Sequence, residues 1–264
     1  MTGPAPTPGR PEKENVRAMF DAIAPRYDLL NRVLSARVDV AWRKKAVRAL
    51  GVRPGDCVLD LATGTGDLLL EELTAGAAKS VGADLSFGML RLVRPKFAAD
   101  GYRDSRVCQG DAERLPFADA CFNGASIAFG IRNVLDRAQG VREMRRVVKP
   151  GRRVVVLEFH ETTGVIGTIF RFYFNHILPR IGALVSSRAA YSYLPKSVAN
   201  FESPEGFGAL MRGAGLKDVK SQPLTFGIAW LHVGEVQRSS GGSSTLTPAA
   251  PRGDVAGRPP SRAT

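Results

Sequence analysis

Hydrophobic positions change their spacing along the chain, and these changes divide it into predicted strands and helices. Short apolar runs, typical of buried strands, alternate with segments in which apolar residues recur every three or four positions, as in helices. The predicted strands are Cys57–Ala62, Ser80–Leu85, Arg106–Gly110, Ala120–Ala128, Arg153–Phe159, Lys217–Leu224 and Ile228–Val236. The predicted helices include Phe87–Ala99, Asp136–Val148 and Pro204–Gly213. The alternation predicts an α/β fold: a doubly wound, Rossmann-like, mostly parallel seven-stranded sheet with an N-terminal helical cap.

Some segments depart from this rhythm. Residues 1–15 and 238–264 are rich in Pro, Gly and small polar residues, and we expect them to be a disordered leader and tail. Between them we expect one domain, 16–237, whose first part, 16–50, is the helical cap, with a break near Pro25. Residues 165–203 are expected to form a substrate-side insertion, in which aromatic residues alternate with arginines. A Lys149-Pro150-Gly151 turn is expected to end the preceding helix.

Composition restricts the possible functions. The formal net charge of +12 favours an anionic partner, either nucleic acid or a membrane surface, although a solvated arginine-rich surface is the plain alternative. No basic-aromatic run typical of RNA-binding modules is present, so we expect no nucleic acid partner. Three scattered cysteines and three histidines without ligand spacing predict no disulfide framework and no metal site. With no secretory signal, we expect a cytoplasmic protein that contacts the inner face of the membrane peripherally.

The first predicted strand ends in a glycine turn, Gly64-Thr65-Gly66, four residues after Asp60. A dinucleotide fingerprint requires a third small residue, but this chain has Leu69 in that place. An acid beside the turn suits a cationic sulfonium ligand better than a pyrophosphate. The pattern resembles the first motif of class I S-adenosylmethionine-dependent methyltransferases, with Asp60 and the turn holding the methionine moiety. The alternative is a tight strand–helix turn that binds no ligand.

Two further acids stand at predicted strand ends. Asp84 follows the second strand, 18 residues after Gly66, where an acid can accept hydrogen bonds from both ribose hydroxyls. Asp111 and Ala112 follow the third strand and would face the adenine amino group. Each acid has a structural alternative as a helix N-cap. Because parallel strands end at one edge of a sheet, we expect these side chains to form one binding site.

The chain closely resembles the ubiquinone/menaquinone biosynthesis C-methyltransferases over roughly residues 16–236. The matching runs are Phe20-Asp21, Tyr27-Asp28-Leu29-Leu30-Asn31, Leu34-Ser35, Trp42-Arg43, Leu59-Asp60-Leu61-Ala62, Gly64-Thr65-Gly66-Asp67, Asp111-Ala112-Glu113-Arg114-Leu115-Pro116-Phe117, Ile127-Ala128-Phe129-Gly130-Ile131-Arg132-Asn133-Val134, Val148-Lys149-Pro150-Gly151, Leu157-Glu158-Phe159, Tyr191-Ser192-Tyr193-Leu194, Gly227-Ile228 and Leu231-His232. The chain departs from the family pattern at Thr63, Asp111, Asn123, Arg152, His160 and 36–39.

The resemblance implies methylation of a ring carbon of a polyprenylated quinol with S-adenosylmethionine as methyl donor. Demethylmenaquinol is our first choice of substrate; the benzoquinol precursor of ubiquinone and a secondary metabolite are the alternatives. An RNA methyltransferase and a catalytically dead scaffold are further rivals.

The resemblance also implies roles for particular residues. Ala128 would contact the cofactor, and Arg132, Asn133, Tyr27 and Asp28 would be catalytic, with no general base assigned. A structural ion pair is the alternative for Arg132, and core packing is the alternative for Tyr27.

Overall fold

The structure is a computed structural model that describes residues 13–27, 35, 37–99, 106–162, 164 and 188–238. Its helices are α1 (Lys13–Ile23), α3 (Val38–Leu50), α4 (Asp67–Thr74), α5 (Phe87–Ala99), α6 (Arg137–Val147), α9 (Arg188–Ala199) and α10 (Pro204–Gly213), with short 3-10 turns η1 (Ala24–Arg26), η2 (Ile131–Asn133) and η4 (Thr225–Gly227). Its strands are β1 (Cys57–Leu61), β2 (Lys79–Asp84), β3 (Arg106–Gln109), β4 (Phe122–Ala128), β5 (Val148–Phe159), β6 (Leu216–Leu224) and β7 (Ala229–Val236).

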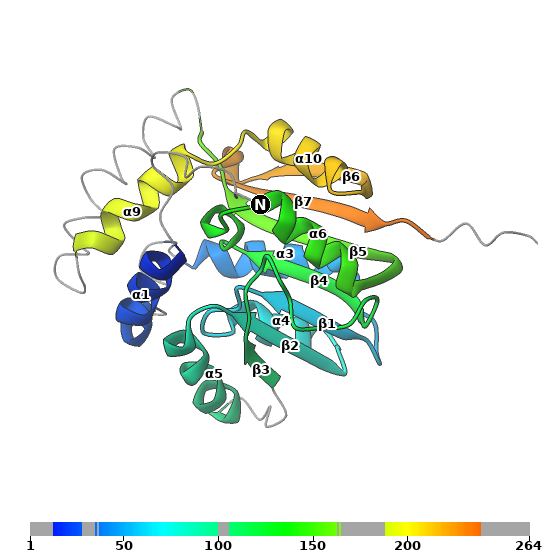
Figure 1. The fold of residues 1–264 in the computed structure, drawn as a ribbon, viewed down its shortest axis with the longest axis horizontal. Coiled ribbons are helices and arrows are strands. Elements are labelled where there is room, and N and C mark those ends of the chain that lie inside the picture. The colour runs from blue at the N-terminus through cyan, green and yellow to red at the C-terminus, as the bar shows by residue number, and fades with distance from the viewer. Residues whose placement is uncertain are drawn as a thin grey trace, which may run out of the picture.

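The seven strands form one sheet in the order β3-β2-β1-β4-β5-β7-β6 (Figure 1). Strands β1 to β5 pair in parallel, whereas β7 is antiparallel to both β5 and β6. The predicted doubly wound, mostly parallel sheet is therefore confirmed. The strand order reverses beside β1, because β2 and β4 lie on opposite sides of it. Open α/β sheets bind ligands at the carboxyl edge of such a switch point.

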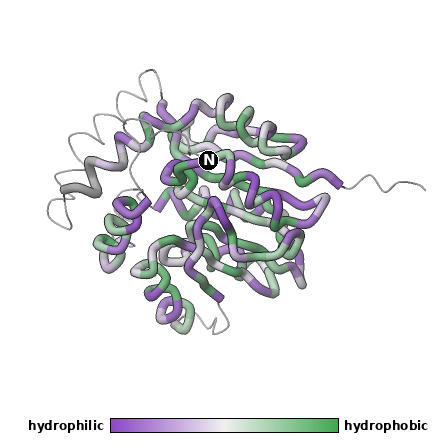
Figure 2. Tube along the Cα trace, in the orientation of Figure 1, coloured by the Kyte–Doolittle hydropathy of each residue, from purple (hydrophilic) through white to green (hydrophobic). Residues whose placement is uncertain are grey.

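Helices cover both faces of the sheet, which explains why the central strands are hydrophobic along most of their length (Figure 2). On one face α3 and α4 pack against side chains that include Val155 of β5. On the other face α6 and α10 pack against Val154 and Val156, its neighbours in the same strand. Successive strand residues point to opposite faces, so one apolar run supplies both layers of the core.

Most predicted boundaries agree with the structure to within one or two residues. Helices α5 and α10 have the predicted limits, and the Ser203 side chain caps α10 by accepting a hydrogen bond from the Gly206 amide. The predicted break near Pro25 is also present, since α1 ends at Ile23 and a 3-10 turn follows.

Other boundaries were wrong. Helix α1 begins at Lys13, inside the expected leader. Strand β5 begins at Val148, which pairs with Phe122 of β4. The Lys149-Pro150-Gly151 turn therefore lies within the strand, and Gly151 has a φ of +75°. Helix α9 occupies the end of the expected insertion. Residues 1–12, 165–187 and 239–264 lie outside the described residues, and so the leader, most of the insertion and the tail stay predictions.

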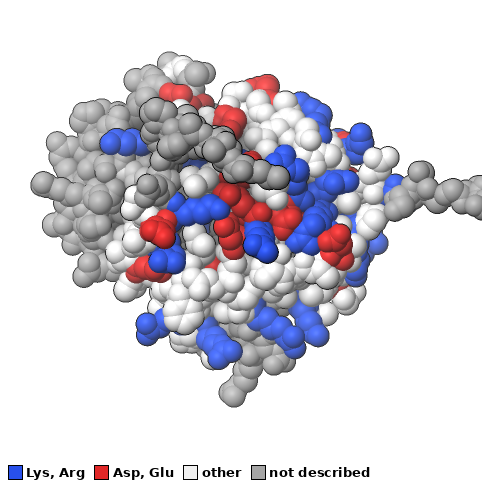
Figure 3. Space-filling view, in the orientation of Figure 1, with Lys and Arg blue, Asp and Glu red and all other residues white. Residues whose placement is uncertain are grey.

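Basic and acidic side chains are interspersed on the face shown in Figure 3. Arg146 of α6 is an example, because it pairs with Glu143 at 2.7 Å and with Asp119 at 2.7 Å. Within the described part of the chain, no helix has both the length and the apolar character needed to cross a membrane.

Candidate active site

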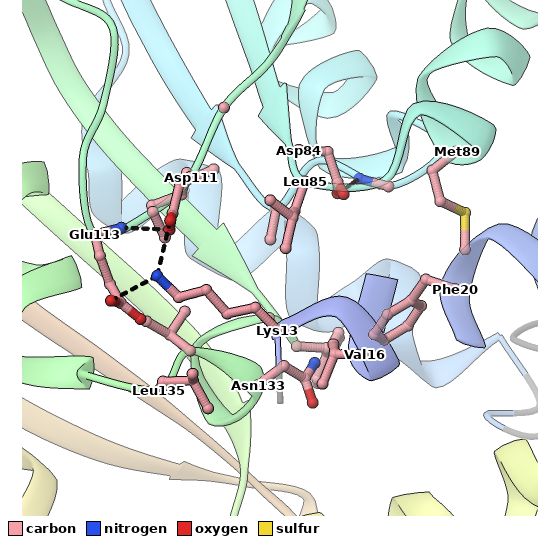
Figure 4. A pocket seen from close by; sticks show the side chains of 18 of the residues that line it. Lys13, Val16, Phe20, Asp84, Leu85, Met89, Asp111, Glu113, Asn133 and Leu135 are labelled. Carbon is pink, nitrogen blue, oxygen red and sulfur yellow. Dashed lines mark hydrogen bonds and ion pairs between the residues drawn. The ribbon is translucent and has the colours of Figure 1, made fainter. Parts of the chain in front are cut away.

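A cavity, partly open to solvent, lies where β1, β2 and β4 end. The sheet edge and its loops form one side, and helix α1 forms another (Figure 4). The lining residues are Lys13, Val16, Phe20, Tyr27, Leu61, Ala62, Gly64, Asp84, Leu85, Met89, Gly110, Asp111, Ala112, Glu113, Ala128, Phe129, Gly130, Asn133, Val134 and Leu135.

The glycine turn after β1 reaches the cavity through Gly64, whose φ of +56° favours glycine. A Cβ on Gly64 would lie 3.8 Å from Tyr27 Cε1, so the Tyr27 ring stands beside the turn. Gly66, at φ +86°, precedes α4, and a Cβ there would approach Phe97 to 2.7 Å. Thr65 and Gly66 are buried and do not line the cavity. They shape the turn that presents Gly64, and their predicted contact with the cofactor stays a prediction.

Asp84 links the turn to the second strand. One of its carboxylate oxygens accepts a hydrogen bond from the Gly64 amide at 2.8 Å, and the other accepts one from the Ser86 amide at 2.8 Å. Burial raises the pKa of Asp84, while these backbone donors oppose the rise. The side chain lines the cavity at the end of β2, as the sequence predicted.

Asp60 lies beneath the turn, and it does not line the cavity. Its Oδ2 accepts hydrogen bonds from Thr63 Oγ1 at 2.6 Å and from the Leu69 amide at 3.1 Å. Burial, and then the nearby carboxyl of Glu72, raise the pKa of Asp60 well above its usual range. Asp60 therefore fastens the turn to the start of α4, and its predicted contact with a methionine moiety stays a prediction.

Asp111 and Ala112 line the cavity beside Glu113, as predicted for the end of the third strand. Asp111 Oδ1 accepts a hydrogen bond from the Glu113 amide at 3.0 Å. Lys13 of α1 donates to Asp111 Oδ2 at 2.8 Å and to Glu113 Oε2 at 2.7 Å (Figure 4). Burial works against the charge on Lys13, but the hydrogen bonds to both acids outweigh it and raise the pKa of Lys13.

Arg132 does not line the cavity, although its neighbour Asn133 does. Its guanidinium donates to Glu158 Oε1 at 2.6 Å and to the Phe129 carbonyl at 2.5 Å, and Glu158 is fully buried. These contacts are those of the structural ion pair that was the alternative for Arg132, and its catalytic role stays a prediction. The predicted catalytic residue Asp28 lies outside the described residues.

Asn133, Tyr27 and Ala128 line the cavity, as expected from their predicted roles. The Tyr193 hydroxyl of α9 donates a hydrogen bond to Asn133 Oδ1 at 2.9 Å. Burial raises the pKa of Tyr193, so the phenol keeps its proton and stays a donor. The amide NH₂ of Asn133 is consequently left to face other partners.

The sequence interpretation placed a helical cap at 16–50 but did not identify which residues of α1 line the cavity. Val16 and Phe20 stand four positions apart, on one helix face, and line the cavity together with Lys13. Their helical spacing predicted an amphipathic helix but not the surface that its apolar face covers. Lys13 was placed in the leader, because proline and glycine dominate the residues before it.

Solved structures share this fold. A methyltransferase from Thermotoga maritima, described as SAM-dependent and as a possible histamine N-methyltransferase, matches with a TM-score of 0.60 over 84% of this chain and 99% of that one. Its sequence identity of 20% means that the similarity shows the fold alone.

Sequence comparisons go further. The ubiquinone/menaquinone biosynthesis C-methyltransferase UbiE of Geotalea daltonii is 47% identical over 226 residues, 84% of this chain and 96% of that protein. The demethylmenaquinone methyltransferase of Deinococcus radiodurans is 48% identical over 223 residues, 83% of this chain and 92% of that protein. Residues 10–236 match the ubiE/COQ5 methyltransferase family, and this chain therefore belongs to that family.

Proposed function

We propose that this protein transfers a methyl group from S-adenosylmethionine to a ring carbon of a polyprenylated quinol, with demethylmenaquinol as the acceptor. The observation that carries the proposal is the cavity in which Gly64, Asp84 and Asp111 meet from the ends of β1, β2 and β3. The names of the Geotalea and Deinococcus relatives support a quinone ring as acceptor. Because the first name also covers ubiquinone, the benzoquinol precursor is the second candidate.

The cavity residues fit an adenosyl cofactor. Each carboxylate oxygen of Asp84 takes one backbone donor, which leaves lone pairs for the two ribose hydroxyls. Asp111 would accept from the adenine amino group, and Leu85 and Ala112 offer apolar surface for the base. When bound, the cofactor supplies an electrophilic methyl group on a sulfonium. Beneath the turn, Asp60 holds the backbone of Gly64 in place through its contact with Thr63.

On the acceptor side, Asn133 is the residue whose orientation the structure defines. The Tyr193 hydroxyl donates a hydrogen bond to Asn133 Oδ1, so the NH₂ group of Asn133 is available to the cavity. A quinol ring carbon becomes a stronger nucleophile when a ring hydroxyl loses its proton. A fixed amide donor stabilises the resulting oxyanion, and Tyr27 beside Gly64 restricts where the ring can lie.

Labelled methyl transfer tests this function. Purified protein in detergent is given labelled S-adenosylmethionine with reduced demethylmenaquinone and, separately, with the reduced ubiquinone precursor. We expect label in the naphthoquinol, and a loss of more than about 100-fold in kcat/KM for Asp84→Ala, since the ribose contacts are lost. The control is Asp119→Ala. Asp119 is an exposed acid that pairs with Arg146 of α6, and this variant should keep its activity. Label in the benzoquinol alone would show that the ubiquinone precursor, and not demethylmenaquinol, is the acceptor. Label in neither quinol would refute quinol methylation.

The same edge of the sheet carries exposed apolar side chains, and these support a peripheral membrane contact. Among the described residues, the large hydrophobic side chains that are exposed are Val38, Phe87 and Phe226. Val38 begins α3, Phe87 follows the end of β2, and Phe226 precedes β7, whose Ala229 pairs with Phe159 at the end of β5. All three therefore lie toward the edge where the cavity is found. A prenyl chain would reach the cavity from a lipid surface at this edge.

Vesicle flotation tests the membrane contact. We expect the protein to float with vesicles that contain anionic lipid and to lose most of that binding in Phe226→Ser, because Phe226 is 79% exposed. Gln222→Ala, at an exposed position of the neighbouring strand β6, is the matched control. Equal flotation of wild type and Phe226→Ser would remove Phe226 from the contact, and no flotation of the wild type would refute the contact itself.

A further inference from the structure

Helix α1 is fastened at both ends to the rim of the cavity. At its start, Lys13 Nζ lies between Asp111 Oδ2 at 2.8 Å and Glu113 Oε2 at 2.7 Å (Figure 4). Two turns later, Asp21 Oδ1 accepts hydrogen bonds from Ser86 Oγ at 2.5 Å and from the Gly88 amide at 2.9 Å. These attachment points follow β3 and β2 respectively, so α1 spans the tips of two strands.

Two side chains between the two attachments face the cavity. Val16 and Phe20 line it, and Phe20 makes an edge-to-face contact with Tyr27, at 6.4 Å between ring centroids. The apolar face of α1 therefore closes the site, and the polar residues at its ends determine how firmly it is held. A molecule that fills the cavity has to pass this helix or displace part of it.

Lys13 differs from Asp21 in that its two partners, Asp111 and Glu113, are both carboxylates that line the cavity. Asp111 Oδ1 already accepts from the Glu113 amide, and Asp111 Oδ2 accepts from Lys13. Under the proposed function, on which this step rests, the adenine amino group is a second donor directed at Asp111. Each Asp111 oxygen accepts one donor in the structure, so lone pairs remain for the amino group while Lys13 stays paired with both acids.

The charges on the cavity wall also favour a paired Lys13. The cavity wall carries three carboxyl groups, on Asp84, Asp111 and Glu113, and Lys13 is the one cation among the described residues that line it. A lysine that lost both partners would leave two acids side by side without a counter-charge, which is unfavourable for like charges at short range. Lys13 is thus favoured to stay paired with these two acids.

We propose that Lys13 is a latch for the cofactor cavity. It holds α1 closed over the cavity through its ion pairs with Asp111 and Glu113. Opening of α1 limits both entry and exit of the nucleoside. Lys13 is accordingly a positioning residue, which controls access and takes no part in methyl transfer.

Stopped-flow binding of S-adenosylhomocysteine to the full chain tests the latch. In Lys13→Met we expect both the association and dissociation rate constants to rise about tenfold, because α1 opens more often. Raising the salt concentration should accelerate binding to the wild type, by screening the ion pairs, and should have little effect on the variant. Arg17→Met, at an exposed position of the same helix, is the matched control and should bind as the wild type does.

A charge swap separates the latch from a general effect on folding. Lys13→Glu combined with Glu113→Lys should restore slow exchange, whereas Lys13→Glu alone should exchange fast; thermal unfolding checks that each variant is folded. Rate constants of Lys13→Met within twofold of the wild type would overturn the latch and leave the proposed function standing. Failure of the wild type to bind S-adenosylhomocysteine would instead overturn both.

Discussion

His160 of the chain after β5 and His232 of β7 share a hydrogen bond between their Nε2 atoms at 2.9 Å. His160 Nδ1 lies 2.9 Å from the Glu202 carbonyl, which can only accept, so Nδ1 carries the proton. His160 Nε2 therefore accepts from His232 Nε2–H, and His232 Nδ1 accepts from the Ser221 hydroxyl at 2.8 Å. Both rings are neutral and fully hydrogen-bonded in the core.

This pair should make the fold sensitive to acid. Burial lowers the pKa of His160 to about 4 and that of His232 to about 3. In the unfolded chain both titrate near 6.5, so the folded state resists protonation, and the contribution of the pair to stability falls as pH drops below about 6.5. The loss approaches roughly 3 kcal/mol per pH unit for two histidines.

Urea unfolding at pH 7.5 and pH 5 measures the effect. His160→Phe with His232→Leu should lose less stability between these two pH values than the wild type does. An equal loss in both proteins would contradict the assignment of neutral, acid-sensitive rings.

Glu72 should produce the opposite pH dependence. Its carboxyl is fully buried and accepts hydrogen bonds from Ser80 Oγ and Ser126 Oγ, both at 2.5 Å. Burial raises its pKa to about 7, so its protonated form adds stability at low pH, and that stability is lost as pH rises through about 7. The shift corresponds to about 3 kcal/mol. Glu72→Gln should therefore be more stable than the wild type at pH 8.5 and not at pH 5.5, as urea titration can establish; a pH-independent difference would contradict this.

Tyr193 should matter for turnover more than for cofactor affinity. Tyr193→Phe removes the hydroxyl that holds Asn133 Oδ1, so the amide can rotate. One neutral hydrogen bond is worth about 0.5–1.5 kcal/mol, and we expect kcat to fall about three- to tenfold with the KM for S-adenosylmethionine unchanged. Asn133→Asp, which presents acceptors where the amide presents donors, should lose far more. If Tyr193→Phe changed only the KM for the cofactor, the orienting role would be wrong.

Gly66 and Gly55 form a matched pair for a test of packing beneath the cofactor turn. Both have a left-handed φ, of +86° and +88°, but a Cβ on Gly66 would meet Phe97 at 2.7 Å, whereas Gly55 has nothing within 4 Å. Gly55→Ala should cost about 1–2 kcal/mol from the backbone alone. Gly66→Ala should cost about 1–3 kcal/mol more through overpacking, as thermal or urea unfolding would show. Equal losses would mean that Phe97 moves aside freely.

Much of the site could be predicted because strand ends carry a clear signal. Asp84, Asp111 and Gly64 each follow an apolar run, and parallel strands place such residues at one edge whatever the details of packing. The alternating runs likewise determined the sheet, since one strand must serve two buried faces.

Side-chain partners were beyond the reach of the sequence. Lys13 meets Asp111 across 98 positions, and Arg132 meets Glu158 across 26, and neither separation has a periodicity that a pattern could show. Asp60 lies near the predicted end of the strand, but its carboxyl points toward the core. Side chains alternate between the two faces along β1, and that of Asp60 lies on the face covered by α4.

The sequence by itself thus determined the fold class, the family and the order of the strand ends, because these depend on local spacing and on runs of residues. Only the tertiary structure decided which acid faces the cavity, which arginine is used up in an ion pair, and which helix closes the site. Those outcomes depend on burial and charge pairing between distant segments, and such pairings form only after the chain has packed.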